Sequence, residues 1–84
     1  MSPFWREGLP LRLETQGAGP RRFHWHWRWH RVDDVLYHWR IHTDWWTDQE
    51  IWRDYWELTT DTGLLCTLYC DLLDGEWYLE RVYE

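Results

Sequence analysis

The chain has 84 residues, a length that fits one small domain and excludes a multidomain protein. Its formal net charge of −6 argues against non-specific binding to nucleic acid, which needs an excess of basic residues. Aromatic residues make up 20% of the chain and include ten tryptophans, so we expect a core built mainly from indole rings.

The first ten residues are expected to form a flexible arm, and residues 11–84 a single small β domain. Residues 1–10 lack the apolar run and cleavage site of a secretory signal, and no segment is long enough for a membrane helix. We therefore expect a cytoplasmic protein without membrane contact. Residues 11–14 alternate apolar and charged side chains, which predicts a short strand, and residues 16–20 contain two glycines and a proline, which predicts a loop.

Residues 21–32 are rich in aromatic and β-branched side chains, which predicts extended structure with two alternative pairings. In one continuous strand, Phe23, Trp25, Trp27 and Trp29 would share a face. In a hairpin that turns at His26-Trp27, Phe23 would pair with His30, and Trp27 would sit on an exposed tip. The hairpin needs a tight turn without Gly or Asn, which is costly.

Residues 33–47 fit either a helical turn or a bent strand, and we favour the strand. Polar residues from 43 to 49 surround Trp45 and Trp46, which predicts a loop that exposes both indoles. Three strands should follow, at Ile51–Thr60, 64–72 and Trp77–Tyr83, joined by turns at Gly63 and Gly75. The predicted fold is all-β, a small antiparallel sheet of about six strands curled into a partial barrel, with at most one short helix.

Several kinds of chemistry are disfavoured by the residues present. Ser2 is the only serine, and no Gly-rich phosphate loop occurs, so we expect no enzyme activity and no cofactor. Cys66 and Cys70 would lie about 13 Å apart on one strand, at ~3.3 Å per residue, too far for a disulfide, so we expect two reduced thiols. The five histidines lack cysteines or carboxylates at matching ligand spacing, so no metal site is expected.

Charge is unevenly distributed along the chain, which suggests two candidate binding surfaces. Residues 21–42 carry a net charge of +3 and residues 43–84 a net charge of −9. Arginine and aromatic residues alternate in the basic segment, a pattern typical of single-strand nucleic-acid binding. The acidic half contains the tryptophans of the predicted loop, a composition typical of protein interaction sites. The candidate binding residues are Arg22, His24, Trp27, Arg28 and Trp29 in the first surface, and Trp45, Trp46 and Trp52 in the second.

Several short strings in the second half carry a family resemblance. These are Trp45-Trp46, Arg53-Asp-Tyr-Trp56, Thr62-Gly-Leu64, Leu68-Tyr69 and the ending from Gly75 to Tyr83. They resemble the C-terminal segment of the bacterial mutagenesis protein ImuB, a catalytically inactive relative of Y-family DNA polymerases. They are also similar to a stand-alone bacterial family of unknown function, which shares Pro20-Arg-Arg-Phe23, Trp29 and Arg31-Val32 as well. The resemblance covers roughly residues 9–84.

The resemblance implies a role near translesion synthesis in the response to DNA damage, as an adaptor and not as a polymerase. The implied protein partners are a polymerase-like mutasome component, the replicative polymerase or the sliding clamp. The alternative is a module that binds single-stranded nucleic acid through its arginine and tryptophan surface.

Overall fold

The structure is a computed structural model that describes residues 3–83. Seven antiparallel strands and no helix are found in this part of the chain, which confirms the predicted all-β fold. Their order in the sheet is β1-β7-β6-β5-β4-β3-β2. The strands are β1 (Phe4–Pro10), β2 (Arg12–Gln16), β3 (Gly19–Trp25), β4 (Arg28–Thr43), β5 (Ile51–Thr60), β6 (Leu65–Asp71) and β7 (Trp77–Tyr83).

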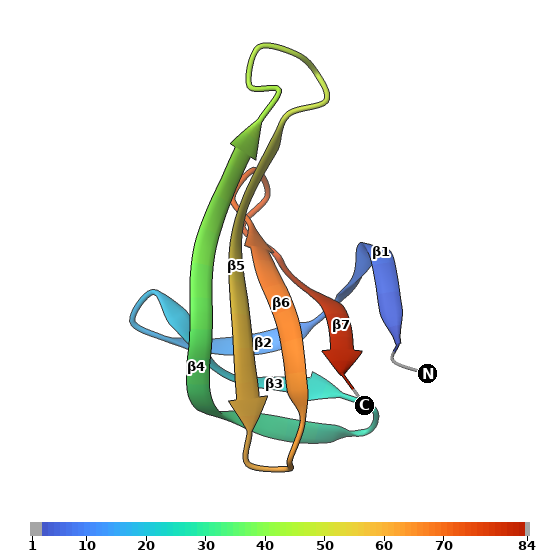
Figure 1. Ribbon diagram of the computed structural model, residues 1–84, viewed down its shortest axis with the longest axis vertical. Coiled ribbons are helices and arrows are strands. Elements are labelled where there is room, and N and C mark those ends of the chain that lie inside the picture. The colour runs from blue at the N-terminus through green and yellow to red at the C-terminus, as the bar shows by residue number, and fades with distance from the viewer. Residues whose placement is uncertain (1–2, 84) are drawn as a thin grey trace.

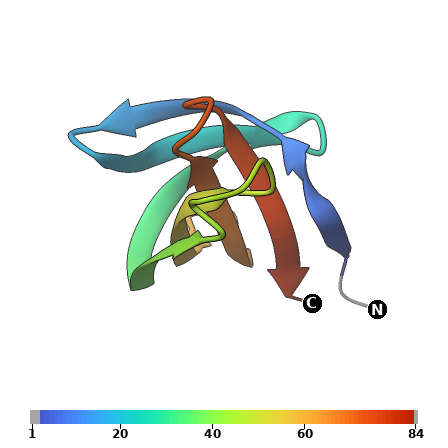
Figure 2. The ribbon, with the colours of Figure 1, turned by 90° about the horizontal axis from the view of Figure 1, so that it is seen from above.

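The sheet curls into a half-barrel because the first hairpin folds back across it. Figure 2 shows β2 and β3 lying over one face of the layer formed by β5, β6 and β7. The far ends of β4 and β5 continue past this barrel and project along the longest axis of the molecule (Figure 1). We call this projecting hairpin, residues 38–56, the arm.

Residues 21–32 form the hairpin, the second of the two predicted pairings. Phe23 lies opposite His30, and Trp25 opposite Arg28. His26 and Trp27 have φ angles of 53° and 70°, the left-handed conformation that a two-residue hairpin turn requires. Packing offsets this strain, because the buried rings of Phe23 and His30 stack at 5.4 Å and His30 Nε2 bonds the carbonyl oxygen of Trp25 at 3.0 Å.

The ambiguous segment after Val32 is a bent strand, and its two bulges explain the ambiguity. Successive partners of β5 skip Asp33 and Leu36, so each is an extra residue in β4. Bulges bend a strand and interrupt its period-two pattern, which imitates helical spacing in the sequence. The bends let β4 pair with β3 over its first residues and with β5 over the rest.

Residues 4–10 belong to the N-terminal segment that the sequence predicted to be flexible and outside the domain, but they form β1 along β7. The Tyr69 hydroxyl donates a hydrogen bond to the Glu7 carbonyl at 3.0 Å, and the Leu11 amide donates to the Trp77 carbonyl at 3.0 Å. Pro10 is tolerated because β1 is an edge strand, which leaves one side of its backbone unpaired. Met1 and Ser2 lie outside the described residues.

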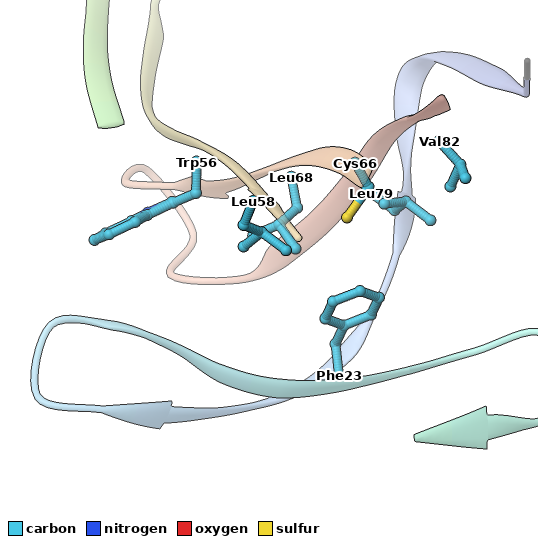
Figure 3. Packing of buried hydrophobic residues seen from close by; sticks show 7 residues of the cluster. All are labelled: Phe23, Trp56, Leu58, Cys66, Leu68, Leu79 and Val82. Carbon is cyan, nitrogen blue, oxygen red and sulfur yellow. The ribbon is translucent and has the colours of Figure 1, made fainter. Parts of the chain in front are cut away.

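The core mixes aliphatic and aromatic side chains and contains a single buried indole among the described residues, so the prediction of an indole-rich core is wrong. Phe23 points from β3 toward buried side chains of β5, β6 and β7 (Figure 3). These are Trp56, Leu58, Cys66, Leu68, Leu79 and Val82. Of the ten tryptophans, all within residues 3–83, Trp56 alone is buried, while Trp5, Trp25 and Trp77 pack half-buried against the cluster. Cys66 and Cys70 are free thiols.

Candidate functional site

The end of the arm presents two indoles to solvent. Trp45 is 65% and Trp46 68% exposed, and their rings meet edge to face with centroids 5.3 Å apart. The loop that carries them is held by its own polar groups, since the amide and hydroxyl of Thr47 each donate to the carbonyl of Asp44 at 3.0 Å. We call Trp45 and Trp46 the indole pair. It is a preorganised apolar surface on an otherwise polar loop.

One face of the arm is stiffened by two imidazole–indole stacks. His42 lies over Trp52 with centroids 4.8 Å apart, and its Nε2 is 2.7 Å from Oε2 of Glu50. His38 lies over Trp56 at 3.6 Å. Each stack joins residues that face each other across β4 and β5. Trp52, a predicted site residue, is therefore half-buried beneath His42 and supports the arm beside the indole pair.

Asp54 links this face of the arm together. Its Oδ1 lies 2.8 Å from His38 Nε2 and 3.5 Å from Arg40 Nε. Sequence reasoning did not assign a role to His38, Arg40, His42 or Asp54. The sequence does contain a signal for this face, since every second residue of one strand is paired with every second residue of the next. These residues are His38, Arg40 and His42 on β4, and Trp52, Asp54 and Trp56 on β5. The pairing can be recognised only when the strand register is known.

The opposite face of the arm begins an aromatic ladder that runs into the sheet. Trp39 stacks on Tyr55 with ring centroids 5.3 Å apart, and Tyr69 stacks on Tyr78 at 5.2 Å. Between them, the rings of Tyr55 and Tyr69 meet at a tilt of 41° with centroids 5.1 Å apart. These four residues are direct partners across β4, β5, β6 and β7. The ladder anchors the arm to the barrel, and Trp39 leaves part of its ring exposed.

Arg22, His24 and Trp29, three predicted site residues, lie together on β3 and β4. The Arg22 guanidinium sits 4.5 Å from the Trp29 ring centroid, and His24 meets the same ring edge to face at 5.5 Å. Arg22 also holds Glu14 through two hydrogen bonds of 2.9 Å, which lower the pKa of the Glu14 carboxyl. The Arg12 guanidinium also lies 5.8 Å from the Trp29 ring centroid, so two arginines already lie over this indole.

Trp27 and Arg28 lie at the turn between β3 and β4, away from the indole pair. Trp27 is 90% exposed, beside a hollow of about 430 Å³ lined by residues 9–11 and 24–27. Figure 1 places this turn low in the view and the end of the arm at the top. The structure therefore divides the predicted site residues between two separate regions.

Nucleophilic and metal chemistry find little support in the side chains of residues 3–83. Burial raises the pKa of the Cys66 thiol to about 12, and burial together with nearby carboxylates, Asp54 first among them, raises the pKa of Cys70. Both shifts reduce the thiolate population at neutral pH. No group of three or more His, Cys, Asp or Glu side chains in this range is arranged to hold a metal ion. Nor does it contain a helix long and apolar enough to cross a membrane.

Comparison with known proteins gives one family. A family model described as "Domain of unknown function (DUF6504)" matches residues 9–84. Neither the curated proteins nor the solved structures contain a match to the chain. The match spans β2 to β7 and begins inside β1.

Proposed function

The chain belongs to the DUF6504 family of domains of unknown function, and from this premise we propose that it is a non-enzymatic adaptor that binds a protein partner in translesion DNA synthesis. The observation that carries the proposal is the indole pair, two tryptophans exposed by 65% and 68% at the end of a stiffened arm. Exposed tryptophan contributes more than most residues to protein interfaces, because it buries a large area with little loss of side-chain entropy.

The surroundings of the indole pair suggest the chemistry of the partner surface. Residues 44–50 contain Asp44, Asp48 and Glu50 and no basic residue. A complementary partner therefore offers an apolar pocket with a basic rim, which gives both burial and charge pairing. The resemblance to the C-terminal segment of ImuB suggests where to look, among the polymerase-like mutasome component, the replicative polymerase and the sliding clamp. A partner set of this kind places the protein in the bacterial cytoplasm.

A binding assay with these three purified candidates tests the proposal. We expect at least one to bind, and the variant Trp45→Ala/Trp46→Ala to weaken that binding at least about thirtyfold, since central interface tryptophans contribute about 2 kcal/mol or more each. Trp27→Asn is the matched control, because it removes an even more exposed indole at another site and Asn tolerates the left-handed conformation.

Two results would contradict the adaptor role. The first is that none of the three candidates binds at micromolar concentrations. The second is that Trp27→Asn and the double variant weaken binding equally, which would move the interface away from the arm. Circular dichroism of both variants checks that the fold is retained.

Single-stranded nucleic-acid binding is the second candidate function, and the exposure of Trp27 favours it. The ring stands free at the turn, next to Arg28, where a base can stack without displacing another group. Trp29 is less suited to stacking, because Arg22 and Arg12 already lie over it. Stacking on Trp27 would quench tryptophan fluorescence on addition of an oligonucleotide, and Trp27→Asn would abolish that quenching.

A further inference from the structure

A separate hollow of about 420 Å³ lies where β2, β3 and β4 meet, on the side of the hairpin away from the turn at Trp27. Its lining residues are Gln16, Pro20, Arg21, Arg31 and Val32. Two arginines and a glutamine therefore border one concavity. We call it the arginine hollow.

A β-bulge accounts for the position of Arg21. Glu14 pairs with Arg22 and Thr15 with Pro20, so Arg21 is an extra residue in β3. An extra residue breaks the alternation of side chains, and bulges next to functional sites commonly redirect a side chain in this way. The two consecutive arginines serve different ends. Arg22 binds Glu14, while Arg21 borders the hollow.

Neither arginine of the arginine hollow forms an ion pair within the described residues. Arg22 and Arg31 lie directly opposite each other on β3 and β4, an arrangement that destabilises a sheet unless the charges are compensated. Glu14 compensates Arg22, whereas the ion pairs found in residues 3–83 include neither Arg21 nor Arg31. Asp61 is close to Arg31, but its Oδ1 accepts a hydrogen bond from the Arg31 main-chain amide.

We propose that the arginine hollow binds a phosphate group. Guanidinium groups match phosphate oxygens through paired, charge-assisted hydrogen bonds, and the Gln16 amide adds a neutral donor. A bound phosphate supplies the counter-charge that Arg21 and Arg31 lack. The group has two possible sources, free phosphate and the phosphodiester backbone of a single-stranded nucleic acid. The site involves neither the arm nor the indole pair, so it stands apart from the adaptor role.

Titration of the ¹⁵N-labelled protein with inorganic phosphate at constant ionic strength, set with chloride, tests the site by NMR. We expect saturable shifts of the amides of Gln16, Arg21, Arg31 and Val32. Arg21→Gln and Arg31→Gln should each weaken binding about tenfold or more, because each removes charge-assisted hydrogen bonds. Arg6→Gln is the control, since it removes the same charge from an exposed position outside the hollow and should leave the affinity unchanged.

A second titration, with a fluorescent single-stranded oligonucleotide, distinguishes the two sources. If the ligand is a phosphodiester, the oligonucleotide binds more tightly than phosphate, and the slope of log K against log salt falls by about 0.7 in the Arg21→Gln/Arg31→Gln variant, because the hollow contacts one phosphate at ~0.7 per contact. Binding of phosphate without a gain for the oligonucleotide indicates free phosphate.

The proposal is overturned if phosphate causes no saturable shifts, or if both arginine variants bind it as the unsubstituted protein does. Arg21→Gln keeps the test decisive should Arg31→Gln fold poorly, because Arg21 is exposed. The Trp45→Ala/Trp46→Ala variant should retain full phosphate binding. Failure of the adaptor role and failure of the phosphate site are therefore separable.

Discussion

The tryptophans show what residue-level reasoning can and cannot predict. Trp45 and Trp46 are exposed, as the polar residues around them predicted, and their role in binding stays a prediction. The burial of most other indoles was overestimated. Composition gives the area that the rings offer, but an 84-residue sheet protein has room to bury few side chains as large as an indole. Smaller residues such as Leu58 and Val82 fill the interior instead.

Gly8 is a single residue on which the position of β1 depends. Its φ of +79° is unfavourable for any other residue type, and an added Cβ would lie 2.8 Å from Cβ of Tyr78 and closer still to the Tyr69 hydroxyl. That hydroxyl bonds the carbonyl of Glu7, so the close approach of Gly8 and the hydrogen bond of Tyr69 depend on each other.

We predict that Gly8→Ala lowers the free energy of unfolding by about 2 kcal/mol or more, because it combines backbone strain with overpacking. Urea unfolding followed by tryptophan fluorescence measures the change. Gly17→Ala is the matched control, since Gly17 also has a positive φ but open space around it, and it should cost less. Equal losses at the two positions would show that contact with Tyr69 and Tyr78 contributes nothing.

The strands differ in how far the sequence revealed them. β5, β6 and β7 were predictable, because strong apolar runs alternate with turns at Gly63 and Gly75, both of which have positive φ. β1 was not, because Gly8 and Pro10 resemble loop residues, and only the pairing with β7 makes the segment extended. The bulges in β3 and β4 were also invisible, since register is a property of two strands and not of one.

The turn between β3 and β4 gives a test at this scale. His26 and Trp27 both occupy the left-handed region, which costs about 1 kcal/mol or more for each non-glycine residue. We predict that His26→Asn/Trp27→Gly, which supplies the preferred residues for this turn, raises the free energy of unfolding by about 1 kcal/mol. The midpoint of urea unfolding should rise at unchanged slope. A lower midpoint would mean that the two side chains stabilise the turn more than their conformations strain it.

At the scale of the whole molecule, the fold separates regions that are close in sequence. Trp29 and Trp45 lie only 16 positions apart, yet the bent β4 places Trp29 on the barrel and leads to Trp45 at the end of the arm. The sequence predicted which residue types would be exposed, but not this separation, because it depends on the length and curvature of β4. The division leaves room for independent binding of a protein and of a phosphate group.

A buried thiol and a buried phenol, both protonated at neutral pH, make the stability of the whole fold sensitive to alkaline pH. Burial raises the pKa of Cys66 from 9.0 to about 12, and burial, opposed in part by the Arg53 guanidinium, raises the pKa of Tyr69 from 10.0 to about 12. Each group is more easily deprotonated in the unfolded chain, so its contribution to stability is complete below pH 9 and is lost as the pH rises toward 12.

We therefore predict that the free energy of unfolding, measured by urea titration, is steady from pH 7 to pH 8.5 and falls steadily from pH 9 to pH 11. Cys66→Ala should be less stable at pH 7, because it leaves a small cavity, but should lose less stability between pH 9 and pH 11. An unchanged free energy of unfolding up to pH 11 would contradict the buried, protonated state of both side chains.

The pairing of β1 with β7 also bears on where this domain begins. The family match starts at residue 9, whereas the sheet starts at Phe4. A fragment trimmed to the match would lose most of β1 and leave the main-chain groups of β7 unpaired near Arg81 and Val82. Unpaired strand edges of this kind form hydrogen bonds with strands of other chains and promote aggregation. Any fusion or truncation should therefore keep residues 3–8 attached, even though the family's shared sequence does not include them.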